Sequence, residues 1–359
     1  MVGPGAVIAS VGVAHPPPVT QDELWREFFS THYAGVARGL AKRVFAHAGV
    51  VTRHAVVNPG VEDLSRWPTS ARMERYLAEA LPLGKDATSS ALGRAGVAAT
   101  EIGMLVVCSC TGYATPGLDI LLARDLGLAA DARRVFVGHM GCYAAIPGLG
   151  VAADYVAVHG RPAVVLCVEL PSLHVQPPTT DPQQVVAHAL FSDAAAAVVL
   201  VPQATRSQRA SSGEAAGGPA VREVASRTDT TAADHMTWQV TDLGFRMGLS
   251  PEVPDVLARH VGPFIDDLLA RQGLAVPDVG AWAVHPGGPR ILDVAQQSLE
   301  LPDAAMAASR ECLADHGNCS SPTVLLILDR LLRERSAAGR PMVLMAFGPG
   351  LTVCAALLH

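Results

Sequence analysis

Two stretches that lie half a chain apart resemble each other, and this internal duplication restricts the fold more than any other feature. The stretch LGRAGVAATEIGMLVVCSCTG begins at Leu92, and LARQGLAVPDVGAWAVHPGGP begins at Leu269. Each has the pattern of a helix end, a glycine C-cap, a short acidic turn and a buried strand. GRPAVVLCVE from Gly160 and GRPMVLMAFG from Gly339 repeat at nearly the same spacing. Two matches at nearly one spacing predict two homologous α/β halves.

The duplication also sets the predicted domain boundaries. Residues 1–201 form the first half and residues 236–359 form the second. The segment 202–235 lies between them and is rich in Ser, Ala, Gly and Thr, which predicts a connecting loop region without chemistry of its own.

Composition narrows the classes of function. Half of the 359 residues are hydrophobic and only 17% are charged, against about 25% in an average globular chain. This composition favours a large core and a buried interface between subunits. The net charge of −6 and the lack of a basic stripe argue against a nucleic-acid partner.

Targeting and metal-binding patterns are also missing from the sequence. The start, MVGPGAVIASVGVAHPPP, has no basic region of the kind that signal peptides carry. The most apolar late stretch, MVLMAFGPGLTVCAALLH, is interrupted by Gly-Pro-Gly and is not expected to span a membrane. Seven cysteines without CxxC spacing predict neither a disulfide framework nor a zinc site. We therefore expect a cytoplasmic protein without a bound metal.

One cysteine stands at the mouth of a long apolar run, FVGHMGCYAAIPGLGVAADYVAVHG from Phe136. The pattern predicts a strand that ends at Met140, a tight turn that exposes Cys142, and a buried helix behind it. Pro147 fits only the first turn of that helix, so the helix is expected to start late. A helix start would stabilise a thiolate. Ordinary core packing of the cysteine is the alternative.

The second half carries two polar residues at comparable places. His285 ends an apolar strand before Pro-Gly-Gly, and Asn318 precedes the helical pattern of SSPTVLLILDRLL. If the halves pack about a pseudo-twofold axis, these ends converge with Cys142 on one cleft, because open α/β sheets bind ligands at strand ends. An N-cap role is the alternative for Asn318.

A thiol, an imidazole and an amide suit acyl transfer through a thioester. The imidazole activates the thiol, and the amide can donate a hydrogen bond to a developing oxyanion. Two such donors also suit decarboxylation, because they stabilise an enolate. We expect the imidazole of His285 to lower the pKa of Cys142 from about 8.5 to about 5–6.5, with burial as the opposing effect.

These settings together resemble the type III polyketide synthases, the chalcone and stilbene synthase family of the thiolase superfamily. The matching motifs are GHMGCYAA, ALFSDAAAAVV, HPGGPRILD, HGNCSSPTVLLILD and AFGPGLT, and they span roughly the whole chain. The resemblance implies a duplicated, thiolase-like αβαβα layered α/β fold. It implies that Cys142 carries the growing chain as a thioester, that His285 activates it, and that His285 and Asn318 promote malonyl decarboxylation.

The resemblance also implies substrate-binding residues. Phe191 and Phe245 match the family's two gatekeeper phenylalanines, with core packing as the alternative for Phe245. Cys110 stands where some bacterial naphthalene-type synthases have a cysteine in the cavity wall, with packing as its alternative. Thr115 is implied to approach the partner's cavity in a homodimer. The other implied substrate-binding residues, which lie inside the quoted motifs, are Ser320, Gly287 and Gly288.

The chain departs from the family in several places. The usual Gly-Asp-Gly after the first gatekeeper is Ser192-Asp193-Ala194, and the usual small residue after Ser-Ser is Pro322. The family's basic residues for coenzyme A phosphates do not align cleanly, which leaves Lys42, Arg43 and Arg53 as candidates. The resemblance implies no cofactor, with malonyl-CoA and an acyl-CoA starter as substrates. The departures leave room for an acyl carrier protein as donor.

The expected reaction is iterative decarboxylative condensation of malonyl-CoA onto an acyl starter, followed by cyclisation to a pyrone or a resorcinol. The stretch GFRMGLSPEVPDVL looks more like bacterial alkylpyrone and alkylresorcinol synthases than like the plant enzymes, which favours a fatty acyl starter. A tetrahydroxynaphthalene-type synthase that uses malonyl-CoA only is one alternative. A β-ketoacyl synthase III is another alternative, although its histidine normally lies in the motif His-Gln-Ala-Asn, whereas His285 lies in His-Pro-Gly-Gly. An inactive thiolase-fold scaffold subunit is the alternative outside enzymes.

Overall fold

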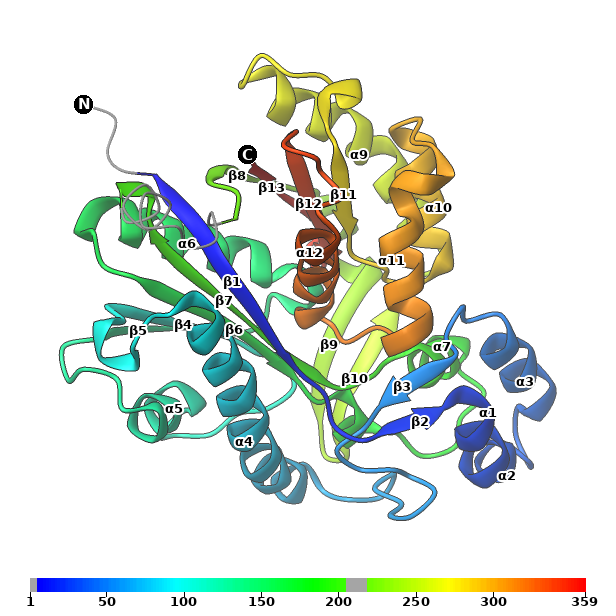
Figure 1. The fold of residues 1–359 in the computed structure, drawn as a ribbon. Helices are drawn as coiled ribbons and strands as arrows, with labels where there is room; N and C mark the ends of the chain where they lie inside the picture. Colours follow the sequence, from blue (N-terminus) through cyan, green and yellow to red (C-terminus); the bar gives the residue numbers. More distant parts are fainter. Residues whose placement is uncertain (1–4, 205–217) are drawn as a thin grey trace.

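The computed structural model describes residues 5–204 and 218–359, which form two sheets with helices between and around them (Figure 1). The expected surface loop lies largely at 205–217, outside the described residues. The first sheet contains, in spatial order, β1 Ala6–Ala14, β7 Ala194–Pro202, β6 Ala163–Glu169, β4 Met104–Cys108 and β5 Arg133–Val137. The second contains β11 Ala281–Val284, β12 Met342–Gly348, β13 Thr352–Leu358 and β8 Val221–Thr228.

Two small antiparallel pairs and the helices complete the described chain. The pairs are β2 Pro18–Thr20 with β3 Thr52–His54, and β9 Met236–Thr241 with β10 Gly244–Leu249. The helices are α1 Gln21–Leu24, α2 Ser30–His32, α3 Arg38–Ala46, α4 Thr69–Ala95, α5 Leu118–Leu126, α6 Ala145–His159, α7 Pro182–Leu190, α9 Val253–Ala270, α10 Pro289–Ser298, α11 Asp303–His316 and α12 Pro322–Glu334.

The two sheets repeat the same arrangement, as the internal duplication predicts. The order β4–β6–β7–β1 in the first sheet corresponds to β11–β12–β13–β8 in the second. In both sheets the first pair is parallel and the next two pairs are antiparallel. Strand β5 extends the first sheet beyond β4.

The repeated stretches have the same local geometry. Helix α4 ends directly before Gly96, and α9 ends three residues before the matched Gly273; the two glycines have φ values of 61° and 67°. A residue with a side chain is strained in that left-handed region, so glycine allows the chain to leave the helix. A 3-10 turn and then a buried strand, β4 or β11, follow in each copy.

The segment between the halves contains more regular structure than its composition predicts. Strand β8 lies within 202–235, and it pairs with β13 as the edge strand of the second sheet. Its side chains are intermediate or exposed without regular alternation, which is a weak strand pattern. We therefore propose to count β8 with the second half, which then begins near residue 220.

The core lies between the two sheets and contains α6 and α12 side by side. Helix α6 contacts β4 and β6 on one side and β8 and β13 on the other, while α12 contacts β7 and β11. Their side chains share one apolar cluster with both sheets. The outer face of the first sheet is covered by α4, and that of the second by α9 (Figure 1). The result is the αβαβα layering of a thiolase-like fold.

One stretch, 141–159, is long and apolar enough to cross a membrane by length and composition alone. Most of it is α6, where Ile146, Leu149 and Val156 are fully buried between the sheets. Burial of such a side chain contributes about 1.5–3 kcal/mol to stability. The apolar character of this stretch is thus explained by its central place in the core.

Candidate active site

Cys142 lies in a turn between the first sheet and the central helix. Strand β5 ends at Val137, so the expected strand end at Met140 is wrong by three residues. The backbone then turns through His139 and Gly141, which have φ values of 64° and 68°. Cys142 occupies the 3-10 turn that follows. Helix α6 begins behind it, and Pro147 lies in its first turn, as predicted.

His285 and Asn318 come from the second half. His285 directly follows β11, and its backbone N–H donates to the carbonyl of Met345 at 2.8 Å. Asn318 follows the end of α11, and its backbone N–H donates to Leu190 O at 2.9 Å. Its side-chain Oδ1 accepts from the backbone N–H of Ser320 at 2.8 Å. The N-cap of α12 is Ser321, so the alternative of Asn318 as that cap is wrong.

All three side chains line one cavity of about 370 Å³. Most of its wall is apolar and comes from α7, the β9–β10 hairpin, α9 and α10. Phe191, Gly287 and Gly288 line the same cavity. The apolar wall residues include Val186, Leu190, Met236, Met247, Leu249, Val253, Leu257, Ile291 and Phe347.

A second, much smaller cavity of about 30 Å³ lies on another side of Cys142. Cys110 and Ser320 line it together with Trp238 and Met236. The indole Nε1–H of Trp238 donates to the carbonyl of Cys110 at 2.8 Å, which holds the ring against this space. Trp238 was not among the residues selected from the sequence, because it lies in β9, next to the compositionally biased segment, and outside every motif.

The two remaining sequence-selected residues lie apart from the larger cavity. Phe245 is buried in a third cavity of about 50 Å³ that it shares with Phe191. It stacks on His174 with ring centroids 4.5 Å apart, so packing explains much of its position. Thr115 is exposed on the loop before α5, where its Oγ1–H donates to Tyr113 Oη at 3.3 Å.

Glu169 lies at the end of β6 and supports the floor of the site. Its carboxylate accepts hydrogen bonds from Cys110 N at 3.0 Å, from Thr111 Oγ1 at 2.7 Å and from Ser321 Oγ at 3.1 Å. Complete burial raises the pKa of Glu169, and these hydrogen bonds oppose the shift. It thus joins both halves beneath Cys142. The sequence analysis did not select Glu169, because it is one acidic residue at the end of an apolar strand and lies outside every motif.

The charge states at the site differ from the expectation for Cys142. Burial raises the pKa of the Cys142 thiol to about 12, while hydrogen bonding by Ser320 and Asn318 opposes the shift. Burial also lowers the pKa of His285 to about 3. Both ring nitrogens of His285 are buried without a hydrogen-bond partner in the described part of the chain. The expected lowering of the thiol pKa is therefore wrong for this arrangement, because desolvation outweighs the hydrogen bonds to the sulfur and His285 forms none with it.

The candidates for binding coenzyme A phosphates are also revised. Arg53 is buried, and its Nη1 donates to the carbonyls of His188 and Phe191, so it is not placed at the surface to meet a coenzyme A phosphate. Lys42 and Arg43 are exposed on α3. Arg290 is exposed in the first turn of α10 and lines the 370 Å³ cavity. This arginine was present in the HPGGPRILD motif, but the sequence did not show that it faces the cavity.

Both halves match profiles of one protein family. Residues 3–203 match the N-terminal domain of chalcone and stilbene synthases, and residues 222–359 match the C-terminal domain. The solved structure of PKS-I from the brown alga Ectocarpus siliculosus superposes with a TM-score of 0.91 at 29% identity. That superposition covers 99% of this chain and 98% of the other.

Curated relatives extend the comparison to bacteria. The chain is 38% identical to a 1,3,6,8-tetrahydroxynaphthalene synthase of Streptomyces peucetius subsp. caesius, over 88% of this chain and 82% of the relative. It is 32% identical to an alpha-pyrone synthesis polyketide synthase-like protein of Mycobacterium tuberculosis, over 87% of this chain and 80% of the relative. It is 33% identical to a 3,5-dihydroxyphenylacetyl-CoA synthase of Streptomyces toyocaensis, over 90% of this chain and 84% of the relative.

Proposed function

This chain belongs to the chalcone and stilbene synthase family of type III polyketide synthases, and we propose that Cys142, His285 and Asn318 carry out its iterative condensation of malonyl-CoA. The observation that carries the proposal is their convergence: residues from both halves line one cavity with a mostly apolar wall. A β-ketoacyl synthase III and an inactive scaffold receive no support, because both family profiles match and the three reactive side chains lie together.

The chemistry starts with acyl transfer to the thiol. Cys142 Sγ attacks the carbonyl carbon of the starter thioester, and His285 accepts the thiol proton. Coenzyme A leaves as its thiol when that proton is returned. Because both groups are neutral in the free protein, the proton moves during the attack. The dry cavity strengthens the interaction between the charges that form.

Chain extension then needs a carbanion at the carbon that lies between the two carbonyl groups of the malonyl unit. The malonyl thioester oxygen would face His285 and Asn318, whose side-chain N–H groups can donate hydrogen bonds to it. Loss of CO2 leaves an electron pair that is delocalised as an enolate. The enolate carbon attacks the acyl group on Cys142, and the sulfur leaves as the lengthened chain moves to the incoming coenzyme A.

The 370 Å³ cavity supports an apolar acyl starter, with cyclisation to a pyrone or resorcinol. A second candidate is tetrahydroxynaphthalene-type synthesis from malonyl-CoA alone. The position of Cys110 in the small cavity beside Cys142 favours it, as does the 38% identity to such a synthase. Incubation of the purified protein with malonyl-CoA alone, and then with a panel of acyl-CoA or acyl carrier protein starters, separates the two by product mass. No condensation product under any condition would overturn the proposed function.

Product length is expected to depend on Trp238. Trp238→Ala should enlarge the 30 Å³ cavity and give products that are heavier by whole acetate units or differently cyclised, because the indole occupies that wall. Mass spectrometry of the products measures this effect. Trp238→Phe fills most of the same space and serves as the control, with an unchanged product profile. Unchanged products from an active Trp238→Ala protein would show that this cavity does not limit the chain.

Arg290 is proposed to contact a phosphate of coenzyme A. Arg290→Ala should raise KM for malonyl-CoA by about three- to tenfold with little change in kcat, because an exposed charge pair contributes about 1 kcal/mol and acts equally before and during the reaction. Steady-state kinetics at two salt concentrations measure the effect, which salt should reduce. The control is Lys85→Ala, an exposed cation on α4. An unchanged KM would remove Arg290 from the substrate path.

The assembly is proposed to be a homodimer in which Thr115 approaches the partner's cavity. The low share of charged residues and the exposed position of Thr115 support this proposal. Sedimentation velocity measures the state, and a fully active monomer would contradict it. A cytoplasmic location, with no catalytic cofactor, stays part of the same proposal.

A further inference from the structure

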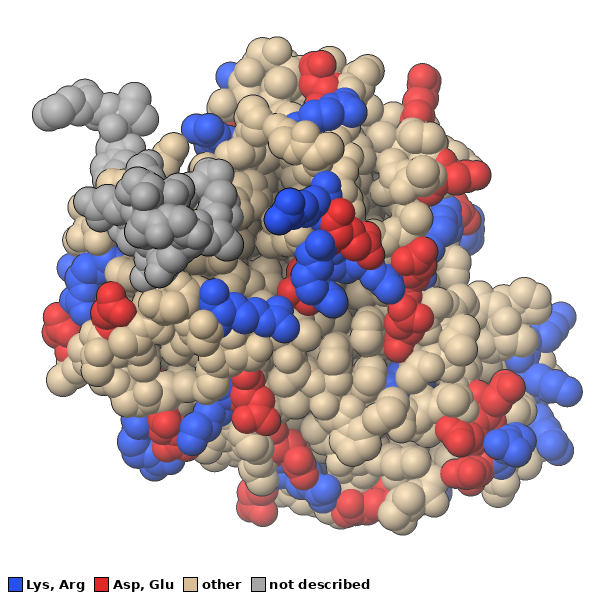
Figure 2. All heavy atoms as spheres, viewed as in Figure 1, with Lys and Arg blue, Asp and Glu red and all other residues tan. Residues whose placement is uncertain are grey.

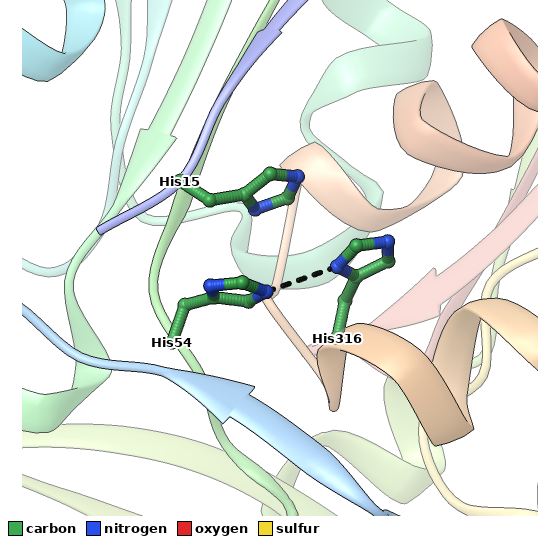
Figure 3. A group of neighbouring side chains, drawn as sticks. All are labelled: His15, His54 and His316. Carbon is green, nitrogen blue, oxygen red and sulfur yellow. Dashed lines mark hydrogen bonds between the residues drawn. The ribbon is translucent and has the colours of Figure 1, made fainter. Parts of the chain in front are cut away.

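We propose that His15, His54 and His316 form a binding site for one divalent transition metal ion of the zinc type, behind the loop that carries Asn318. The three residues come from distant parts of the chain: His15 follows β1, His54 ends β3, and His316 ends α11. Each offers a ring nitrogen, and these three nitrogens all lie within 4.8 Å of one another (Figure 3). This site shares no side chain with the 370 Å³ cavity, although His54 also lines the 50 Å³ cavity beside Phe191 and Phe245, and it does not depend on the proposed chemistry.

His54 is already oriented as a metal ligand. Its Nδ1 lies 2.9 Å from the carbonyl oxygen of Pro16, and because a carbonyl can only accept, Nδ1 carries the hydrogen. The lone pair is then on Nε2, which accepts a hydrogen bond from Nδ1 of His316 at 3.1 Å (Figure 3). His316 must therefore move its hydrogen to its own Nε2 before its Nδ1 can bind an ion. Histidine ligands in metal sites usually donate their other N–H to a backbone carbonyl or a carboxylate in this way.

The separations fit an ion after a small ring movement. A tetrahedral Zn²⁺ with bonds of about 2.0–2.1 Å places its ligand nitrogens about 3.3–3.4 Å apart. The 3.1 Å pair is close to this value. The rings of His15 and His316 are stacked, with centroids 4.5 Å apart and an angle of 2° between their planes. His15 must therefore rotate about its terminal side-chain torsion, which has a broad range of allowed angles in histidine. Its Nδ1 is buried without a hydrogen-bond partner among the described residues, so the turn breaks no bond there.

The three imidazoles are neutral, as metal binding requires. Burial lowers the pKa of His15 to about 3 and that of His316 to about 4, and it also lowers the pKa of His54. Their mutual repulsion when protonated adds to the shifts of His15 and His316. Neutral imidazole suits Zn²⁺, Cu²⁺, Ni²⁺ and Co²⁺ better than Mg²⁺ or Ca²⁺. A water molecule can complete the coordination, because none of the three side chains is fully buried.

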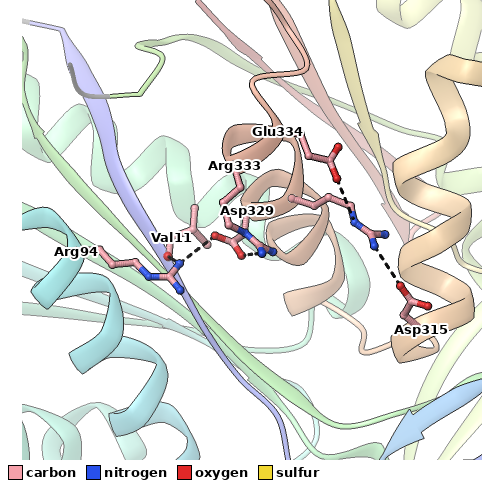
Figure 4. Close-up of polar contacts among 7 residues, drawn as sticks. Val11, Arg94, Asp315, Asp329, Arg333 and Glu334 are labelled. Carbon is pink, nitrogen blue, oxygen red and sulfur yellow. Dashed lines mark hydrogen bonds and ion pairs between the residues drawn. The ribbon is translucent and has the colours of Figure 1, made fainter. Parts of the chain in front are cut away.

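The charges around His316 permit a dication. Arg330 and Arg333 lie nearby and would repel it, but both form ion pairs. Figure 4 shows the pair of Arg333 with Asp329. The paired groups are Arg330 with Glu311, Asp315 and Glu334, Arg333 with Asp329, and Asp329 also with Arg94. This network holds more carboxylates than guanidinium groups, so it does not present a net positive charge to the site. Figure 2 shows the same mixing of blue and red side chains over the part of the face where α12 lies.

A bound ion would join the two halves next to the catalytic cavity. His54 donates its backbone N–H to Ser192 Oγ at 2.8 Å and accepts from Asp193 N at 2.9 Å. Ser192 N donates in turn to the carbonyl of Asn318 at 2.9 Å. His316 precedes Asn318 by two residues. The ion would therefore hold β1 and β3 of the first half against the loop that positions Asn318.

The test uses the untagged full chain, stripped of metal by a chelator and titrated with Co²⁺ alone. We expect one equivalent to bind, with the visible absorption of nitrogen-ligated Co²⁺, and Zn²⁺ to displace it. X-ray absorption of the Zn²⁺-loaded protein should show three imidazole ligands. His15→Ala should weaken Co²⁺ binding at least tenfold. The matched control is His47→Ala, which removes an exposed histidine at the end of α3 and should leave the affinity unchanged.

Three results would overturn the site. The first is the absence of stoichiometric binding to the intact protein. The second is a thiolate ligand in the absorption spectrum, since seven free cysteines are present and would compete for the ion. The third is unchanged affinity in folded His15→Ala. If that variant fails to fold, the spectrum of the intact protein decides alone.

Discussion

Replacing Cys142 with alanine is expected to abolish polyketide formation, by at least about 10⁴-fold, because the variant has no group that can carry the acyl chain. The sulfur lines both the large and the small cavity, so starter and growing chain reach the same atom. The change removes one buried atom next to existing space and should destabilise the fold by only about 1 kcal/mol. Product formation and mass-spectrometric detection of the acyl-protein measure the effect. Cys312→Ala, at another buried cysteine, is the control and should stay active.

Cys142→Gln extends this test to the other two groups. Its side-chain amide can occupy the place of the acyl thioester, while His285 and Asn318 remain in the cavity wall. We expect this variant to release CO2 from malonyl-CoA without forming products or an acyl-enzyme. An acyl-enzyme in Cys142→Gln, or elongation by Cys142→Ala, would remove Cys142 as the carrier.

Replacing His285 with alanine is expected to slow acylation of Cys142 by about 10²–10⁴-fold, the usual range for loss of a general base. The pKa of His285 is lowered to about 3, so its basic form is present throughout pH 5–9 and is not lost on acidification in that range. The pKa of Cys142 is raised to about 12, so its thiol stays protonated over the same range. The rate at which iodoacetamide alkylates Cys142 should therefore keep rising with pH, without a plateau below pH 8. The rate should be lower in His285→Ala than in the intact protein.

The pH profile separates two mechanisms. A plateau with a midpoint near pH 5–6.5 would mean that His285 turns toward the sulfur in the free protein and forms the ion pair that the sequence suggests. Equal rates in the intact protein and His285→Ala would mean that this histidine does not activate the thiol. His159→Ala, at the exposed end of α6, is the control for loss of a histidine and should follow the intact profile.

The duplicated architecture could be predicted because its determinants are local. The glycine after α4 recurs after α9, the buried strands β4 and β11 follow at the same distance, and each pattern is legible within about twenty residues. The convergence of Cys142, His285 and Asn318 was predicted from the same repeat, and the three residues do line one cavity. By contrast, β8 lacks strong alternation, and its pairing with β13 identifies it as a strand.

The sequence by itself thus determined the two-half α/β fold and the family, and it predicted the three side chains that we propose to react. Only the tertiary structure decided the pKa shifts of Cys142 and His285, the narrow space beside Trp238, the burial of Arg53, and the meeting of three histidines. The physical reason is that helix caps and hydrophobic periodicity act between near neighbours along the chain. Desolvation, cavity volume and ligand convergence depend on residues that are distant in sequence and become neighbours only when the two sheets pack on α6 and α12.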